Sequence, residues 1–327
     1  MTSHKILVTG GAGYIGSHVV IDLLEHGWSV VVLDNLRTGL RELLPRNIRF
    51  VHGDAGDTEL VAGLLQSERC RAVMHFAGST VVPESVTDPL SYYRNNTAIS
   101  RNLLAACALS GVKFFIFSST AAVYGNPETL PVSETTPTLP ITPYGRSKLM
   151  TEAMLQDIAA TSAMRFVALR YFNVAGADPL GRSGQATPNA THLIKVACEV
   201  AVGKRPSMAI YGTDYDTPDG TCIRDFIHVS DLASAHVAAL DHLTRGGGSQ
   251  ILNCGYGWGI SVRQVIETTE RLAGRRLDVV NGPRREGDII SMVADGSRLR
   301  RVLGWAPRHA QIDTIIGSAL DWERRVK

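Results

Sequence analysis

The sequence lacks the features that would place it in an oxidising compartment or in a membrane. It has five cysteines, an odd number with no CxxC pair, so no disulfide framework is indicated and we expect reduced thiols. No apolar run approaches the roughly 20 residues that a membrane-spanning helix needs. The first predicted strand begins so early that we expect no signal peptide. We therefore expect a cytoplasmic protein.

An excess of charge of one sign is also missing. Lysine and arginine number 33, and aspartate and glutamate 31, for a net charge of +2. This balance offers no basic surface for nucleic acid or an anionic membrane, so we expect neither as a partner. The chain has no internal repeat and no low-complexity tract. Its 327 residues, 44% of them apolar and 20% charged, are enough for a large core and for two lobes.

Short β-branched segments alternate with helical patterns in the first half of the chain. We predict strands at residues 5–10, 29–34, 48–54, 71–78, 113–119 and 166–173. We predict helices at residues 14–27, 57–68, 89–111 and from Tyr144 onward. This alternation implies a parallel sheet with right-handed crossovers, and strands that are apolar on both faces suit its interior. The predicted fold class is α/β, with a Rossmann-type doubly wound parallel sheet.

The pattern changes after about residue 175. Residues 176–189 are rich in glycine and proline and end the first region. The remainder predicts one clear strand at residues 250–255 and helices at residues 191–203, 230–243, 261–274 and 314–326. These strands are too few to repeat the first sheet, so we expect a smaller C-terminal α/β lobe beside it.

The stretch "VTGGAGYIG" places Gly10, Gly13 and Gly16 in GxxGxxG spacing. By itself this can be an ordinary glycine-rich turn. Here it follows a predicted strand and opens a predicted helix, which is the context of a dinucleotide-binding loop. Glycines let the backbone approach a pyrophosphate, and the helix N-terminus supplies donors and a positive dipole.

Acidic residues follow the next two strands. Asp34 ends the second strand, where a carboxylate binds the adenosine ribose hydroxyls and repels a 2′-phosphate, which favours NAD over NADP. Arg37 weakens this inference because it can neutralise a phosphate, and Asp34 with Asn35 can also simply begin a turn. Asp54 ends the third strand, where it can contact adenine or cap a helix.

A second cluster of polar residues follows the fifth strand. Hydroxyls stand at Ser118, Ser119 and Thr120, and strand ends at this edge of a parallel sheet are where ligands bind. In "ITPYGRSK", Pro143 suits a first helical turn and Thr142 can cap it. Tyr144 and Lys148 then lie one turn apart on one face. This is either an ordinary helix start or a set of groups that converges over a nicotinamide.

These motifs stand in order with several others, namely "TGGAGYIGSH", "HFAG", "SST", "VYG", "PYGRSK", "LRYFNVAGAD", "DGTCIRDFIHVSDLA" and "RREGD". With them the chain resembles the extended short-chain dehydrogenase/reductases, and within that family the nucleotide-sugar 4-epimerases, over nearly its whole length. The resemblance implies an NAD-binding Rossmann domain at residues 1–174, to which residues 221–258 return. It implies a UDP-sugar-binding lobe at residues 175–327, and a homodimer that packs helices 89–110 and 144 onward against their copies.

The resemblance also implies a reaction. UDP-glucose and UDP-galactose would be interconverted at carbon 4 through a transient 4-keto intermediate, with NAD regenerated in each turnover. Tyr144 would take the proton from the 4-hydroxyl, and Lys148 would bind the nicotinamide ribose and favour the phenolate of Tyr144. Thr120 would donate a hydrogen bond to the sugar oxygen or to Tyr144. The other implied cofactor-binding residues are Gly10, Gly13, Tyr14, Ile15, Gly16, Asp34, Asn35, Asp54, Ala55, Phe76, Ala77, Gly78, Asn95, Ser118 and Tyr171.

At the substrate end, the resemblance implies that Arg224 and Arg285 bind the diphosphate and that Asp288 binds the uridine ribose. Taken singly, an arginine is more often a surface charge. His192 stands where some relatives have an asparagine, so its role stays open. Thr80 stands where some relatives have a lysine that binds the NAD pyrophosphate, so one positive charge at the cofactor is missing. The implied substrate-binding residues are Thr120, Tyr144, Asn173, His192, Leu193, Arg224, Phe226, Arg285, Asp288 and Met292.

Two further comparisons narrow the chemistry. Dehydratases of the same superfamily carry an acidic pair beside the Ser/Thr, where this chain has Ala121 and Ala122, so elimination lacks its acid and base. At the position of Met292, some relatives have a bulky tyrosine, which is associated with excluding N-acetylated sugars, and a small residue there admits them. Methionine is intermediate in size, so the sequence does not settle which sugars are accepted.

Alternatives therefore stay open: 4-epimerisation of UDP-N-acetylglucosamine, UDP-xylose or UDP-glucuronate, or a non-catalytic sensor of NAD or sugar nucleotide. No metal site is indicated, since His75 and His228 are more typical of core histidines.

Overall fold

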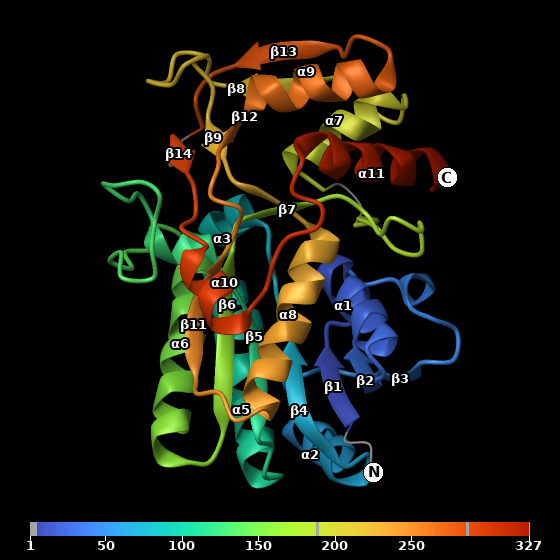
Figure 1. Cartoon of the computed structure of the whole chain (residues 1–327), viewed down its shortest axis with the longest axis vertical. Helices are drawn as coiled ribbons and strands as arrows, with labels where there is room; N and C mark the ends of the chain where they lie inside the picture. Colours follow the sequence, from blue (N-terminus) through green and yellow to red (C-terminus); the bar gives the residue numbers. More distant parts are fainter. Residues whose placement is uncertain (1–4, 188–189, 286–287, 327) are drawn as a thin grey trace.

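A seven-stranded parallel sheet forms the centre of the molecule (Figure 1), as seen in a computed structural model that describes residues 5–187, 190–285 and 288–326. Its strand order is β11-β6-β5-β4-β1-β2-β3, which is a doubly wound order. The strands are β1 (Lys5–Thr9), β2 (Ser29–Asp34), β3 (Arg49–His52), β4 (Cys70–His75), β5 (Phe114–Thr120), β6 (Arg165–Tyr171) and β11 (Gln250–Cys254). The predicted fold class is confirmed.

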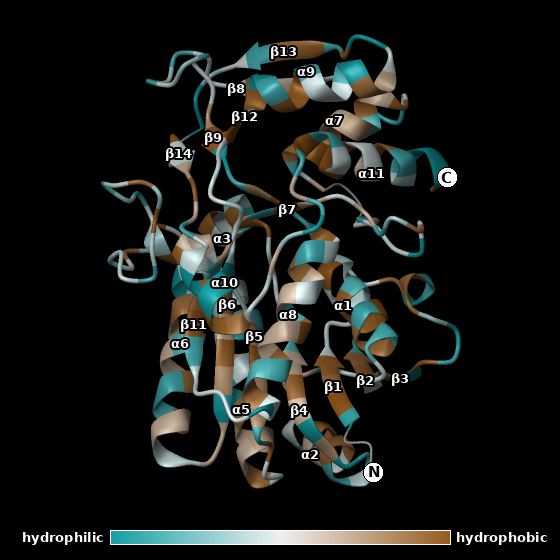
Figure 2. Cartoon of the chain, in the orientation of Figure 1, coloured by the Kyte–Doolittle hydropathy of each residue, from teal (hydrophilic) through white to brown (hydrophobic). Residues whose placement is uncertain are grey.

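Helices cover both faces of this sheet because its strands are apolar on both sides. In β1, Ile6 and Val8 belong to one apolar cluster and Leu7 to the other. The first cluster includes α1 (Tyr14–Glu25) and α8 (Val229–Thr244), and the second includes α2 (Thr58–Ser67), α5 (Ile99–Leu109) and α6 (Pro143–Thr161). Figure 2 shows mainly apolar strands between helices of mixed polarity.

Beyond the carboxyl ends of the strands lies a smaller lobe, which Figure 1 shows at the top. It contains α7 (Leu193–Ala201), α9 (Val262–Ala273) and α11 (Ile312–Arg325), with α10 (Ser297–Leu303) nearer the sheet. Its short strands form three small sheets: β8 (Met208–Tyr211) with β13 (Val279–Gly282), β12 (Ile260–Ser261) with β9 (Ile223–Arg224) and β14 (Ser291–Met292), and β10 (Phe226–His228) with β7 (Asn173–Ala175).

The second half of the chain contributes to the large sheet as well. β11 pairs with β6 in parallel, and α8 packs against α1 and the sheet. Both segments lie within residues 221–258. The division of the chain at residues 174 and 175 stays a prediction, and Lys327 at its end lies outside the described residues.

Some elements differ from the sequence-based expectation. The helix predicted at residues 89–111 is divided into α4 (Pro89–Tyr92), a π-helical turn η2 (Tyr93–Ala98) and α5. The wider turn accompanies buried Asn95 and Asn96, and the Asn96 amide donates to Ser79 O and Ser147 Oγ. The strand predicted at residues 166–173 ends at Tyr171, because Asn173 begins β7 in a separate sheet. Not predicted were α3 (Val82–Thr87) and the short helical turns η1 (Arg41–Leu43) and η3 (Ala121–Tyr124).

Within the described ranges, no helix combines the length and apolarity needed to cross a membrane. All five cysteines are buried and unpaired.

Candidate active site

The glycine loop lies between the end of β1 and the start of α1. Gly10 has a φ of +71°, and a Cβ there would lie 2.4 Å from the backbone nitrogen of Ala77. A Cβ at Gly16 would lie 2.2 Å from Gly10 O, so only glycine fits at either position. Gly13 is the N-cap of α1 and supplies no side-chain acceptor. The first amide groups of α1 therefore face outward as an anion site.

Next to this loop, the carboxylate of Asp34 is held from two sides. Its Oδ2 accepts from Ala12 N at 2.9 Å and its Oδ1 from Leu36 N at 2.8 Å. The neighbouring Asn35 amide donates to Asp54 Oδ2 at 3.2 Å. Both oxygens of Asp34 keep a further lone pair, so the carboxylate is oriented and can still accept from hydroxyl groups.

The structure brings these cofactor candidates to one edge of the sheet. Tyr14 donates to Gly176 O at 2.6 Å, which connects the start of α1 to the strand leading into the small lobe. Ile15 packs against the core, and Ala55 is buried directly after Asp54. Ala77 follows β4 with its amide bound to Thr9 O, beside the glycine loop. This arrangement fits a dinucleotide laid across the strand ends.

A second group of candidates lies at the ends of β5 and β6. The Tyr171 hydroxyl lies 2.5 Å from Ser118 Oγ, and the Lys148 ammonium donates to Ser118 O at 3.0 Å. A Cβ on Gly78 would lie 3.7 Å from Lys148 Nζ. Phe76 follows β4 in the same segment as Gly78, and its ring centre lies 4.9 Å from that of His236. Asn95 lies slightly apart, where its amide donates to Ser79 Oγ.

The helix start predicted from "ITPYGRSK" is confirmed. Pro143 occupies the first turn of α6, and Thr142 Oγ1 accepts from Gly145 N at 3.2 Å. Tyr144 and Lys148 are both buried, 6% and 4% exposed, so this helix points its polar groups inward. Tyr144 lies near Thr120, the last residue of β5, closely enough for the Thr120 side chain to affect its pKa.

Burial controls the ionisation of these groups. It raises the pKa of Tyr144, and the side chain of Thr120 lowers this pKa by a smaller amount. Burial also lowers the pKa of Lys148 to about 8, which leaves it mainly protonated at neutral pH. The expected tuning of the pKa of Tyr144 by Lys148 stays a prediction.

The residues after Thr120 carry no acid or base. Ala121 and Ala122 begin η3, and the Ala122 amide donates to Thr120 Oγ1 at 3.1 Å. The nearby carboxylate of Glu152 is engaged by Arg170 at 2.6 Å and by Ser119 at 2.5 Å. It is therefore neutralised within the core.

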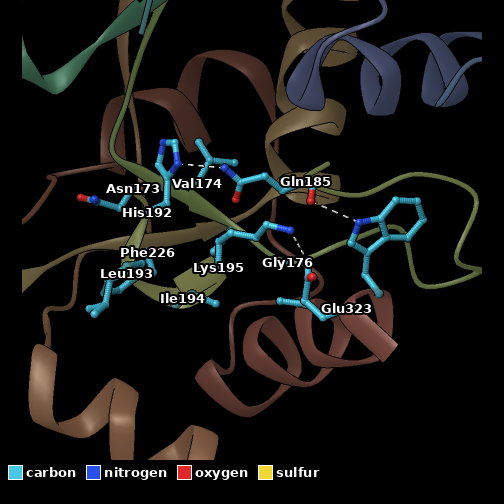
Figure 3. A pocket seen from close by; sticks show the side chains of 13 residues that line it. Asn173, Val174, Gly176, Gln185, His192, Leu193, Ile194, Lys195, Phe226 and Glu323 are labelled. Carbon is cyan, nitrogen blue, oxygen red and sulfur yellow. Dashed lines mark hydrogen bonds and ion pairs between the residues drawn. The ribbon is translucent and has the colours of Figure 1, made fainter. Parts of the chain in front are cut away.

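Four predicted substrate residues line one pocket between the strands β7 and β10 and the helices α7 and α11 (Figure 3): Asn173, His192, Leu193 and Phe226. Asn173 and Phe226 are paired across β7 and β10, which places them side by side. His192 lies 2.8 Å from the Gln185 amide through Nδ1, and burial lowers its pKa, so the imidazole is neutral.

The other substrate candidates form a second group nearby. Met292 pairs with Arg224 across β14 and β9, and Arg224 forms a 3.5 Å ion pair with Asp288. The Arg285 guanidinium lies 3.7 Å above the ring of Tyr211. Met292 packs in an apolar cluster with η3, which joins this group to the region of Thr120. Glu286 and Gly287 of the "RREGD" motif lie outside the described residues.

Sequence reasoning missed several residues of this region. Gln185, Lys195, Trp322 and Glu323 also line the pocket, and Lys195 is paired with Glu323. Gln185 and Trp322 are 137 positions apart, so no local pattern connects them. Tyr211 is an exposed aromatic at a strand end, and only that feature could have pointed to it.

The two singled-out histidines are satisfied core residues. His75 contacts Thr9 Oγ1 and Ser100 Oγ, and His228 contacts Ser318 Oγ. Among the residues that the structure describes, no three His, Cys, Asp or Glu side chains are grouped to hold a metal ion.

Comparison with known proteins adds to this geometry. Residues 6–255 match the model of the NAD dependent epimerase/dehydratase family. The chain is 58% identical over 325 residues to UDP-glucose 4-epimerase of Azospirillum brasilense, covering 99% of this chain and 93% of that protein. The crystal structure of UDP-glucose 4-epimerase from Brucella ovis in complex with NAD is 45% identical, with a TM-score of 0.94, over 97% and 98% of the two chains. The UDP-Glc/GlcNAc 4-epimerase of Campylobacter jejuni is 47% identical, with a TM-score of 0.86, over 99% and 100%.

Proposed function

The chain belongs to the NAD dependent epimerase/dehydratase family, and from this premise we propose that it interconverts UDP-glucose and UDP-galactose by inverting carbon 4, with NAD as cofactor. The observation that carries the proposal is the convergence of Thr120, Tyr144 and Lys148 at the end of β5, next to Gly78 and the segment that packs on the glycine loop. The full-length similarity to a UDP-glucose 4-epimerase supports the same activity.

The residues at the sheet edge fit NAD. The amides at the start of α1 suit its pyrophosphate, and the oriented carboxylate of Asp34 suits the adenosine ribose. When bound, NAD takes a hydride from carbon 4 of the sugar and later returns it. Lys148, held by Ser118 O, would bind the nicotinamide ribose and keep a positive charge in the site.

Tyr144 is the group that would take the 4-hydroxyl proton. Because burial raises its pKa, the phenol must gain positive neighbours before it acts as a base. The ammonium of Lys148 is one such neighbour. Thr120, whose side chain lowers the pKa of Tyr144, would hand the proton on or bind the sugar oxygen. Because positions 121 and 122 are alanines, the site has no acid and base there for elimination. Reversible oxidation and reduction of the sugar at carbon 4 remains.

The second group of substrate residues suits a nucleotide diphosphate. Arg224 and Arg285 supply cations, and Asp288 lies beside Arg224 where it can bind a ribose hydroxyl. Asn173, His192, Leu193 and Phe226 line the adjoining pocket. With the nucleotide held there, the ketose can turn about its bond to the diphosphate and present its other face to the returning hydride.

A second candidate substrate is UDP-N-acetylglucosamine. A relative that is 47% identical to this chain is named for both UDP-Glc and UDP-GlcNAc. Met292, the residue whose size bears on this choice, is packed beside η3 with a flexible side chain. UDP-xylose and UDP-glucuronate are less favoured candidates, and a non-catalytic sensor has no use for the buried Tyr144.

We also propose a homodimer in the cytoplasm. Val82, Val86, Leu90 and Met150 are exposed apolar side chains on α3, α4 and α6, and these three helices pack together. Leu90 is 77% exposed. An apolar surface on adjoining helices suits a second copy of the chain. The five unpaired cysteines suit a reducing compartment.

The test is incubation of the purified protein with a panel of UDP-sugars, without added NAD, followed by chromatography of the products. Conversion of UDP-galactose to UDP-glucose supports the proposal. No conversion of any UDP-sugar by NAD-loaded protein would overturn it and favour the sensor.

A further inference from the structure

We propose that Asp225 is the positioning residue of the substrate end, and that it holds the diphosphate-binding strand in register without itself contacting the ligand. The proposal rests on the proposed function for the identity of the ligand. It follows from the place of Asp225 in the chain and from the number of segments that it binds.

Asp225 is the residue between two strands that belong to different sheets. Arg224 ends β9, which lies between β12 and β14, and Phe226 begins β10, which pairs with β7. The backbone amide of Asp225 donates to Met292 O at 3.0 Å, and its carbonyl accepts from Asn173 N at 3.0 Å. Its own backbone therefore joins two further residues of the substrate set.

The side chain of Asp225 completes the connection. It is fully buried, and its Oδ1 accepts from Tyr256 N at 3.0 Å. Its Oδ2 accepts from Gly257 N at 2.9 Å and Ala294 N at 3.2 Å. The first two amides belong to the loop between β11 and β12, and the third follows β14. One carboxylate thus fixes the loop before β12 and the chain after β14, the two strands that flank Arg224.

The surroundings are shaped for this carboxylate. A Cβ on Gly255 would lie 2.8 Å from Asp225 Oδ2 and 2.7 Å from Ala294 Cβ, so glycine is required for the approach. Burial raises the pKa of Asp225 to about 6, with the three backbone amides and Arg300 opposing that rise. Cys254 is the other titratable group influenced by it, and burial raises the pKa of that thiol. At pH 8 the carboxylate is therefore ionised.

Burying an ionised carboxylate at this position costs desolvation free energy, which hydrogen bonds from the surrounding amides offset. With a pKa above the usual 3.8, its effect on folding stability is favourable only at low pH, and it is lost as the pH rises through about 6. At neutral pH the ionised carboxylate accepts three charge-assisted hydrogen bonds, from the amides of Tyr256, Gly257 and Ala294. These bonds hold the segments on either side of β9, and with them Arg224, in place. Loss of those bonds lets β9 shift and weakens diphosphate binding.

The experiment measures UDP binding by calorimetry, together with KM and kcat for UDP-galactose, at pH 8 on NAD-loaded protein. Asp225→Asn keeps the size of the side chain but replaces one acceptor oxygen with a donor. We expect Kd for UDP and KM to rise about tenfold or more. Asp225→Asn loses a hydrogen bond between the carboxylate and a backbone amide, and UDP must then bind to a displaced β9. We expect kcat to stay within about threefold and NAD content to be unchanged, because the hydride and proton groups lie elsewhere.

The matched control is Asp231→Asn. Asp231 is equally buried and also accepts two backbone amides, those of Arg308 and His309, and it binds the hydroxyl of the same Tyr256. It contacts none of the substrate set in these bonds. We expect this variant to lose stability but to bind UDP within about twofold of the wild type.

Gly255→Ala provides a second variant if Asp225→Asn fails to fold, because its methyl group displaces the carboxylate without removing it. The proposal is overturned if Asp225→Asn, or Gly255→Ala where Asp225→Asn does not fold, binds UDP within about twofold of the wild type, or if Asp231→Asn weakens binding as much. Wild-type protein that neither binds UDP nor converts UDP-galactose would instead refute the proposed function, and this inference with it.

Discussion

The ammonium of Lys148 donates to the carbonyl oxygen of Ser118 at 3.0 Å, deep between α6 and the end of β5. This contact ties the helix that carries Tyr144 to the strand that ends at Thr120. Tyr144 and Thr120 are therefore held in register by a residue one helical turn away. The rigid placement of all three groups by packed elements is what general acid–base chemistry requires.

Replacing Tyr144 with phenylalanine should lower kcat by about 10² to 10⁴-fold, because the proton acceptor is lost. NAD content and UDP affinity should be unchanged. Tyr92→Phe is the matched control, since the Tyr92 ring centre lies 6.4 Å from that of Tyr144 and its hydroxyl is bound to Val81 O and Glu84 instead. A Tyr144→Phe enzyme with wild-type turnover would show that another group is the base.

Lys148→Met should abolish most activity and change the pH dependence of stability. Burial lowers the pKa of Lys148 to about 8 from 10.5, so the unfolded chain binds more protons between these values. The unfolding free energy of the wild type relative to Lys148→Met should therefore rise with pH across that window, by at most about 1.4 kcal/mol per unit. Denaturant unfolding at several pH values measures this. A constant difference would mean that Lys148 has an ordinary pKa.

Asp34→Asn should weaken NAD binding about tenfold or more, since the neutral amide loses charge-assisted hydrogen bonds to the ribose. It should also narrow the preference for NAD over NADP, because the repulsion of a 2′-phosphate is removed. Titration of cofactor-stripped protein with each nucleotide measures both effects. Asp57→Asn, which neutralises a carboxylate at the N-cap of α2 but keeps a capping oxygen, serves as the control. Unchanged selectivity would assign the discrimination to another residue, such as Arg37.

Met292→Ala should raise the turnover of UDP-N-acetylglucosamine relative to UDP-glucose. The Met292 side chain is 5% exposed and fills the cluster with Ala121, Val123 and Phe172, so shortening it opens space beside Thr120. The change should also cost about 2–5 kcal/mol of stability. Met164→Ala removes an equally buried methionine from a different apolar cluster, the one that includes α2, α5 and α6, and controls for that cost. A ratio that does not change in Met292→Ala would exclude this position from sugar selection.

Leu90→Asp should convert the proposed dimer to a monomer, because it places a charge in the exposed apolar surface of α3, α4 and α6. Leu180→Asp is the control, as Leu180 is exposed to a similar extent, 71% against 77%, in the loop after β7 and outside the helices of the proposed interface. Sedimentation velocity distinguishes the two states. Equal sedimentation of both variants and the wild type would remove the basis for this interface.

The long apolar strands and the glycine loop could be predicted from sequence because their signals are local. β1, β2, β4, β5 and β6 are buried runs of five to seven residues that periodicity and composition identify. The helix start at Pro143 and Thr142 follows from capping chemistry. The α/β fold class and the position of the cofactor edge follow from these elements together.

The small lobe could not be predicted in the same way. β9, β12 and β14 have two residues each, too few for any pattern, and they exist because distant segments meet. The three amides around Asp225 come from residues 31 to 69 positions away. The bond from Trp322 to Gln185 spans 137 positions. Such contacts are products of tertiary packing, and only the structure reveals them.

The most direct test of the account is the fate of the hydrogen on carbon 4. Purified protein is incubated with UDP-galactose in D₂O, without added NAD, and the product is examined by proton NMR. A hydride that leaves and returns within the site does not exchange with solvent, so we predict UDP-glucose that keeps protium at carbon 4. Deuterium at that position, or no product from NAD-loaded protein, would contradict the account.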